Sequence, residues 1–151
     1  YGELHVLSEG VGITIPFEFS GGPWITNPHE FADALQAIVG GGVIFRPTFV
    51  KPYYGRYKGQ VCGGVQLYVR DREVYKPYLA GLQILAVHQE LYPEIDLFAN
   101  EGRWNMFNKV MGDDQIMLDI QAGKDPAEME AGWLEELNNF AKMRQKYLLY
   151  N

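Results

Sequence analysis

The chain has 151 residues, of which 47% are hydrophobic and 21% charged, and its formal net charge at pH 7 is −6. These values are ordinary for a globular domain with one hydrophobic core, so we expect a single domain over residues 1–151. The acidic balance argues against a nucleic-acid partner, which needs a basic surface. The single cysteine, Cys62, excludes an internal disulfide, and with three scattered histidines it gives no metal-ligand spacing. We therefore expect no metal and no cofactor, and no apolar run reaches membrane-spanning length.

The first third of the chain predicts two strands and a helix. Residues 1–7 alternate weakly between apolar and polar side chains and favour a strand. Residues 13–19 alternate with a period of two and favour a second strand, with Pro16 at an edge or a bulge. Asn27 and Pro28 suit the cap and the first turn of a helix, which three consecutive glycines end. The apolar stripe of this helix consists of Phe31, Leu35, Ile38 and Val39.

The middle of the chain predicts two more strands and a second helix. Residues 43–50 and residues 61–69 are rich in β-branched and aromatic side chains and favour strands. Residues 51–60 between them form a polar, tyrosine-rich loop. Pro77 suits the opening of a helix that Pro93 ends. Its apolar residues are Leu79, Leu82, Leu85, Ala86 and Leu91.

The last third is predicted to be helical. A short helix is expected over residues 105–111, and a second runs through Ile120 after an aspartate cap. Asp125 and Pro126 give a strong start for a final helix. Its inner stripe is predicted to contain Trp133, Leu137 and Phe140. This order of elements predicts an α+β fold, with a small mixed or antiparallel sheet, several helices packed on it and a helical C-terminal part.

The segment from Ser8 to Trp24 is the strongest candidate for a functional loop. Its four glycines and two prolines disfavour regular structure and shape the path of a loop. Glu9 and Glu18 are its two carboxylates, and paired carboxylates serve as general acid and base in glycoside hydrolysis. The alternative is that each carboxylate is solvated or binds backbone donors in a tight turn.

Two further clusters carry polar chemistry. Arg46 lies within an apolar strand, where a charge needs a partner or a ligand, and Lys51 follows it. A guanidinium is suited to bind a carboxylate ligand, and the alternative is a structural pair with an internal Asp or Glu. Tyr54 and Tyr57 belong to the tyrosine-rich loop, which suits either the lining of a sugar groove or a cover for the sheet edge.

The histidines and the cysteine give weaker signals. His5, His29 and His88 are scattered, and a surface or core-edge position is favoured over catalysis for each. Cys62 lies in a predicted strand, where a buried and inert thiol is the default.

Several motifs occur in an order that resembles a known family. They are Ser8-Glu9-Gly10-x-Gly12-x-Thr14-x-Pro16-Phe17-Glu18, Gly22-Pro23-Trp24-Ile25, Phe45-Arg46-Pro47, Tyr57-x-Gly59-x-x-Cys62-x-Gly64-Val65, Asp71-Arg72, Gly81-Leu82, Trp133-x-x-Glu136-Leu137-x-x-Phe140 and Arg144-x-x-Tyr147-Leu148-Leu149-Tyr150. Over nearly the whole chain, they resemble the C-terminal domain of the NamZ-like exo-β-N-acetylmuramidases.

This resemblance implies a glycoside hydrolase that removes terminal β-linked N-acetylmuramic acid from the non-reducing end of peptidoglycan fragments. It implies a larger, Rossmann-like N-terminal partner domain outside this chain, an active site in the cleft between the two domains, and an extracytoplasmic location. The chain would then be an accessory, cleft-forming part that is inactive alone. Homo-oligomers could form through its exposed interdomain patch.

The resemblance also implies a set of site residues. The residues expected to bind the saccharide are Ser8, Glu9, Thr14, Glu18, Arg46, Lys51, Tyr54 and Tyr57, and Glu9 is the one candidate contributor to catalysis. The commoner family pattern has Arg where this chain has Val11, which removes a donor fork for the lactyl carboxylate. Either Arg46 or Lys51 takes over that role, or the sugar specificity differs, or this branch of the family is not a muramidase.

Two functions from other classes also fit the residues. A glycan-binding module without chemistry fits the tyrosines and the lack of a self-contained acid and base. A structural or interaction domain that docks on the other half of the protein predicts a large apolar patch on the isolated chain.

Overall fold

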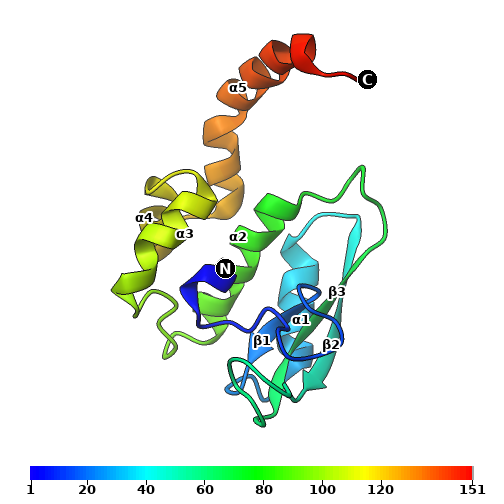
Figure 1. Cartoon of the computed structure of the whole chain (residues 1–151), viewed down its shortest axis with the longest axis vertical. Coiled ribbons are helices and arrows are strands. Elements are labelled where there is room, and N and C mark those ends of the chain that lie inside the picture. Colours follow the sequence, from blue (N-terminus) through cyan, green and yellow to red (C-terminus); the bar gives the residue numbers. More distant parts are fainter. Residues whose placement is uncertain (151) are drawn as a thin grey trace.

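The computed structural model describes residues 1–150. Its strands are β1 (Phe19–Gly22), β2 (Val43–Val50) and β3 (Cys62–Val69), and its helices are α1 (Pro28–Ile38), α2 (Pro77–Leu91), α3 (Trp104–Met111), α4 (Gln115–Gln121) and α5 (Pro126–Arg144). Short 3-10 turns are η1 (Gly2–Leu4), η2 (Glu101–Arg103) and η3 (Gln145–Tyr147). The fold is α+β with a helical C-terminal part, as the sequence predicts (Figure 1).

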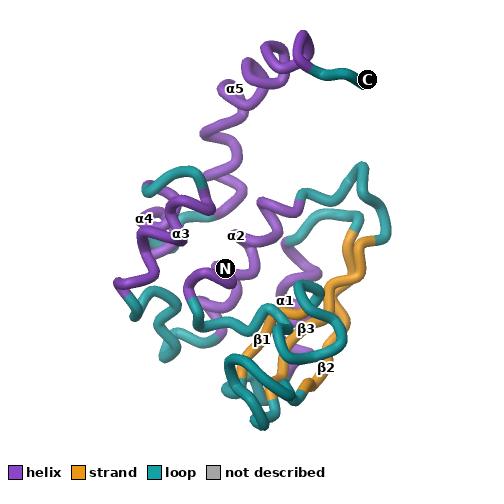
Figure 2. Tube along the Cα trace, viewed as in Figure 1, coloured by secondary structure: helices purple, strands orange, loops and turns teal. Residues whose placement is uncertain are grey.

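The strands form one antiparallel sheet in the order β1-β3-β2. Helix α1 packs on one face of this sheet and α2 packs beside α1 (Figures 1 and 2). The core between them contains Phe31, Leu35, Val43, Phe45, Val65, Leu82 and Leu85, and it continues under α3 and α4 through Leu97, Phe98, Phe107, Ile116 and Ile120. A single connected core therefore joins the sheet to the helical part.

The register of the sheet assigns side chains to its two faces. Val43 and Phe45 are buried toward α1. Gln66 lies in the central strand β3, where it is paired with Arg46 of β2 and with Phe19 of β1. Because side chains alternate along a strand, Arg46, Gln66 and Phe19 share the outer face, away from α1.

The predicted helix starts are confirmed. Proline occupies the first turn of three helices: Pro28 in α1, Pro77 in α2 and Pro126 in α5. The Asp125 carboxylate caps α5 by accepting a hydrogen bond from the Ala127 amide at 2.8 Å. These signals are local, because proline and cap residues act on the backbone beside them.

The predicted strand over residues 1–7 is wrong. Leu4 and Leu7 are both buried, and a 3-10 turn over Gly2–Leu4 brings them to the core together. The side chains of Arg56 and Arg103 donate hydrogen bonds to backbone carbonyls in this segment. The backbone is therefore satisfied by side chains instead of a strand ladder.

The predicted strand over residues 13–19 is also wrong, because the strand begins only at Phe19. The preceding residues turn repeatedly, with positive φ angles of 83° at Gly10, 95° at Gly12 and 66° at Phe17. Backbone in this left-handed region does not continue a strand. The alternation of apolar residues here reflects a folded loop that lies on the sheet.

Two predicted helix stripes need correction. In α1 the side chain of Ile38 is exposed, although the rest of its stripe is buried. In α5, Leu137 and Phe140 are exposed, because the second half of the helix projects from the body (Figure 1). The α5 stripe is therefore an outer surface of this chain. Across residues 1–150, no helix combines the length and apolarity that crossing a membrane requires.

Candidate functional site

The segment between Ser8 and Phe19 is fastened to the sheet at both ends. The Ser8 amide donates to the carbonyl oxygen of Gly21 at 2.7 Å, and the Gly21 amide donates back at 3.2 Å. Ser8 thus extends the sheet by one bridge beyond β1. At the other end, the carbonyl oxygen of Glu18 accepts from the Leu67 amide at 2.7 Å. The loop between these anchors has a fixed position on the outer face.

Phe19 is the residue around which this segment folds. Its side chain lies on the outer face, yet it is fully buried. A Cβ added at Gly21 or Gly64 would lie 2.7 or 2.8 Å from its Cζ atom, so the ring lies directly over these two glycines. Gly10 packs directly against the Phe19 side chain, because a Cβ at Gly10 would lie 3.1 Å from the Phe19 Cβ. The strand glycines therefore make room for an aromatic anchor.

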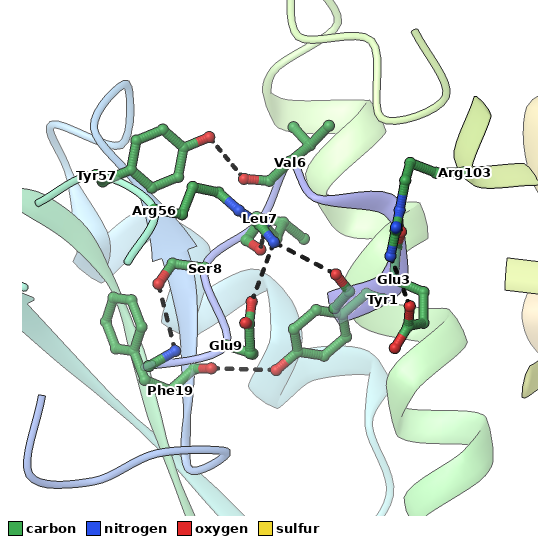
Figure 3. Close-up of polar contacts among 12 residues, drawn as sticks. Tyr1, Glu3, Val6, Leu7, Ser8, Glu9, Phe19, Arg56, Tyr57 and Arg103 are labelled. Atoms are coloured by element: carbon green, nitrogen blue, oxygen red, sulfur yellow. Dashed lines mark hydrogen bonds and ion pairs between the residues drawn. The ribbon is translucent and has the colours of Figure 1, made fainter. Parts of the chain in front are cut away.

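The loop between β2 and β3 packs against the N-terminal segment and holds its backbone (Figure 3). Arg56 donates from Nη1 to the carbonyl oxygen of Leu7 at 2.7 Å and from Nη2 to that of Gly2 at 3.4 Å. The Tyr57 hydroxyl donates to the carbonyl oxygen of Val6 at 2.7 Å. Burial raises the pKa of Tyr57, so its phenol stays protonated and remains a donor.

Glu9 faces this arginine. Its Oε2 atom lies 3.7 Å from Arg56 Nη2, and both side chains are about one-fifth exposed. The same oxygen is buried and accepts no hydrogen bond from within residues 1–150. A buried carboxylate oxygen needs a donor or a cation, and here the guanidinium supplies the charge at ion-pair distance. The arrangement leaves this oxygen able to accept one more hydrogen bond.

Two further contacts tie the first turn to the rest of the chain (Figure 3). The Tyr1 hydroxyl donates to the carbonyl oxygen of Phe19 at 3.1 Å, and burial raises the pKa of Tyr1 to about 12. Arg103 donates to the Glu3 carbonyl oxygen at 2.9 Å and to its carboxylate at 2.8 Å. The segment before Ser8 is therefore fixed between the sheet and α3.

A second polar cluster lies on the outer face of the sheet. Arg46 Nη2 donates to Oε1 of Gln66 at 2.9 Å, and the Tyr68 hydroxyl donates to the same oxygen at 2.9 Å. Gln66 in turn donates from Nε2 to the Glu18 carboxylate at 3.3 Å. The Arg46 guanidinium also lies 5.7 Å from the centre of the Tyr68 ring. A guanidinium, an amide, a phenol and a carboxylate thus form one connected row.

The structure separates the predicted site residues into two groups. Ser8 and Glu9 lie with Arg56 in the loop cluster, and Glu18 and Arg46 lie on the sheet. Glu9 and Glu18 take part in different networks. The remaining predicted side chains, which are Thr14, Lys51 and Tyr54, are exposed on loops, whereas Tyr57 is partly buried.

The alternative interpretation of Arg46, an ion pair with an internal Asp or Glu, is not found: within residues 1–150 its guanidinium pairs with no carboxylate. Its partners are an amide and a ring, so most of its donors remain free. Sequence reasoning did not find Arg56. Its only signal is a charge within a tyrosine-rich loop, and its contacts come from residues far away in the sequence.

His88 is not at the surface or the core edge, as was predicted, but is fully buried. Its Nε2 atom accepts a hydrogen bond from the Trp24 indole at 2.9 Å, and burial lowers its pKa to about 4. Periodicity does not predict this burial, because α2 is apolar over most of its circumference there. Cys62 is buried as expected, and burial raises the pKa of its thiol.

Two hollows lie in the helical part, away from the Ser8–Trp24 segment. A groove of about 510 Å³ runs between the start of α2 and α5, and a hollow of about 630 Å³ lies between α2 and the turn before α5. Within residues 1–150, no group of three His, Cys, Asp or Glu side chains is placed to hold a metal ion. Neither polar cluster contributes a residue to the lining of these two hollows.

Comparison with known proteins assigns this architecture to a family. Residues 2–150 match the family profile described as the C-terminal region of the exo-β-N-acetylmuramidase NamZ. The chain belongs to the NamZ C-terminal domain family. It is 35% identical, over 144 residues, to the peptidoglycan β-N-acetylmuramidase NamZ of Bacillus subtilis strain 168, and the match covers 95% of the chain and 34% of that protein.

A solved structure shares the fold of this NamZ C-terminal domain. It is the crystal structure, at 1.65 Å resolution, of a DUF1343 family protein from Bacteroides fragilis NCTC 9343. The two are 30% identical with a TM-score of 0.88, and the match covers 99% of this chain and 39% of the other. The chain thus spans little more than a third of the length of these relatives.

Proposed function

We propose that this chain is the C-terminal part of a peptidoglycan exo-β-N-acetylmuramidase, and that its outer sheet face forms one wall of the saccharide cleft. Membership of the NamZ C-terminal family over residues 2–150 supports the reaction class. The row formed by Arg46, Gln66, Tyr68 and Glu18 supports the position of the wall. It offers donors and acceptors on rigid strands, as saccharide recognition requires.

Arg46 is the residue that we assign to the acidic part of the sugar. N-acetylmuramic acid carries a lactyl carboxylate, and a guanidinium binds a carboxylate through two parallel hydrogen bonds. Arg46 uses one Nη2 donor on Gln66, and within residues 1–150 it pairs with no carboxylate. Val11, which replaces the commoner arginine, packs near Gly55 and offers no donor. Arg46 then takes over the role of the missing arginine.

In this proposal Glu9 has a structural role, which is to pair with Arg56 beside the outer sheet face, and it does not transfer protons. Its carboxylate is paired with Arg56, which also fixes the backbone of Leu7. Glu18 is held by Gln66 in the other network, so the two carboxylates do not face one reacting bond. We therefore assign the general acid and base to a region outside this chain. Because peptidoglycan lies outside the cytoplasmic membrane, the proposed substrate supports an extracytoplasmic location, which we include in the proposal.

The proposal is tested with a chromogenic β-glycoside of N-acetylmuramic acid. The purified 151-residue chain should give no turnover, whereas a longer polypeptide that carries it together with the remaining part found in its relatives should hydrolyse the glycoside. Turnover by the isolated chain would overturn the accessory role. Hydrolysis of the N-acetylglucosamine glycoside in preference to the muramic acid glycoside would overturn the assignment of Arg46.

A glycan-binding module without chemistry is the second candidate, and two exposed rings favour it. Tyr53 is 84% exposed and Tyr54 is 59% exposed, in the loop beside the wall. Exposed aromatic faces of this kind can stack on sugar rings. Calorimetric titration of the isolated chain with a muramyl-containing disaccharide separates the two candidates. Saturable binding by the chain alone favours the module, and no binding favours a cleft shared with another domain.

A further inference from the structure

Helix α5 leaves the body of the domain half-way along its length (Figure 1). Its first half contacts α2 and α4, and its buried residues are Pro126 and Met129. Trp133 packs on the body, with its ring centroid 5.8 Å from that of Tyr78 in an edge-on arrangement. Beyond Trp133 the helix is free of contact with the sheet and α1 (Figures 1 and 2).

The projecting half is apolar on one side. Trp133, Leu137 and Phe140 recur at helical spacing, so they share one face. The exposed large apolar side chains of this region are Leu134, Leu137, Phe140, Met143, Tyr147, Leu148, Leu149 and Tyr150, and their exposure ranges from 43% for Leu134 to 89% for Leu149. Exposed apolar side chains gathered in one region of a folded protein mark an interaction site.

A groove continues this apolar surface onto the body. It has a volume of about 510 Å³, and its apolar lining includes Pro77, Tyr78, Met111, Trp133 and Phe140. Its rim is held by the ion pair between Lys76 and Glu130 at 2.9 Å. Because Trp133 and Phe140 belong to both, the α5 stripe and the groove form one surface.

Helix α5 is part of the region that aligns with a solved relative. The match to the Bacteroides fragilis structure covers 99% of this chain, so it includes α5, with a TM-score of 0.88. A half-helix without tertiary packing is marginal in water, because helices of this length gain most of their stability from a buried face. Contacts from outside residues 1–150 would therefore stabilise the projecting half of the helix.

We propose that the α5 stripe and its groove dock on the amino-terminal part of the longer polypeptide that carries this domain. The chain matches a C-terminal family profile and covers only 34% and 39% of its relatives, so about two thirds of such a polypeptide precede it. A surface on the same chain meets α5 at an effective concentration in the millimolar range, which favours it over a second copy. The inference rests on family membership and holds whatever sugar is hydrolysed.

Hydrogen–deuterium exchange tests this docking. In the longer polypeptide, the backbone amides of residues 137–144 should exchange about tenfold or more slowly than in the isolated chain, because docking must open before they exchange. The double variant Leu137→Asp and Phe140→Asp should remove that protection. The matched control Asn138→Asp and Asn139→Asp adds the same two charges to the same helix off the stripe, and it should leave protection in place.

Three results would overturn the proposal. The first is equal exchange of these amides in the isolated chain and the longer polypeptide. The second is protection that grows with protein concentration and coincides with a dimer in sedimentation equilibrium, because the occupant would then be a second copy. The third is equal loss of protection in both double variants. Muramidase activity is not a readout, so failure of the proposed function and failure of this docking remain distinguishable.

Discussion

The indole Nε1 of Trp24 donates a hydrogen bond to Nε2 of His88 at 2.9 Å and so joins the segment after β1 to α2. Because Nε2 accepts, the imidazole is neutral and carries its proton on Nδ1. Nδ1 is buried and has no partner among residues 1–150. The centroids of the Trp24 and His88 rings are 5.6 Å apart in an edge-on arrangement, and the Tyr57 ring lies edge-on to Trp24 with its centroid at 5.9 Å. One buried pair thus connects the candidate site to the core.

This pair makes the stability of the fold sensitive to acid. Burial lowers the pKa of His88 from 6.5 to about 4 in the folded protein. Between these values the unfolded chain binds a proton that the folded chain excludes, so the free energy of unfolding falls as pH falls. We expect the loss to reach about 3 kcal/mol at pH 4 from this residue. Urea unfolding at a series of pH values measures it.

His88→Gln is the variant that isolates this term. A glutamine oxygen can accept from Trp24 but does not titrate, so the pH dependence between these pKa values should be flatter than in the wild type. Parallel stability–pH curves for the two proteins would contradict the assignment to His88.

Arg56 should be the most important single side chain for the order of the N-terminal segment. Arg56→Ala removes donors to Leu7 and Gly2 and leaves the buried Glu9 oxygen without a cation. We expect the free energy of unfolding to fall by about 2 kcal/mol, the usual scale for hydrogen bonds from a charged donor. Arg56→Lys should recover less than half, because an ammonium group lacks the fork that reaches two carbonyls. Chemical denaturation measures both.

A double-mutant cycle with Glu9→Gln separates the ion pair from the backbone contacts. Removing the charge of Glu9 should relieve part of the cost of Arg56→Ala, with a coupling of about 1 kcal/mol. Strictly additive effects would show that the pair at 3.7 Å contributes nothing to stability.

The sequence predicted those helices and strands whose formation depends on residues within the element or directly next to it. β2 was predicted over its full extent, β3 lacks one predicted residue, and the prolines and the Asp125 cap located three helix starts. The path of the Ser8–Glu18 segment was not predictable in this way. It depends on positive φ angles and on Arg56 and Arg103, which are distant in sequence.

Periodicity located the stripe of α5 but not its environment. The spacing of Trp133, Leu137 and Phe140 is that of a buried face, and it does not reveal whether the partner surface belongs to the same 150 residues. For the candidate site, too, the sequence predicted some of the residues but not the contacts between them. Glu18 and Arg46 were singled out, but Gln66, which links them, was identified as a link only from the register of β2 and β3.

Arg46 should affect substrate binding more than folding. In the longer polypeptide, Arg46→Ala should raise KM for a muramic acid glycoside about tenfold with little change in kcat, as expected for loss of a contact made equally in ground and transition states. Its stability should change by less than about 0.5 kcal/mol, because the side chain is exposed. Arg72→Ala, in the exposed turn after β3, is the control. Equal KM values for the Arg46→Ala and Arg72→Ala variants would show that Arg46 does not bind the substrate.

The glycines under Phe19 should tolerate no side chain. A Cβ at Gly64 would lie 2.8 Å from Phe19 Cζ and 2.2 Å from the Ser20 carbonyl oxygen, so Gly64→Ala forces the ring and the neighbouring strand apart. Overpacking of this kind costs about 1–3 kcal/mol, and the melting temperature should fall accordingly. Gly132→Ala in α5 is the opposite case, because a Cβ there meets nothing within 4 Å. It should raise stability by about 0.5–1 kcal/mol, since alanine favours a helix interior. A melting temperature unchanged by Gly64→Ala would mean that Phe19 is not seated on the sheet.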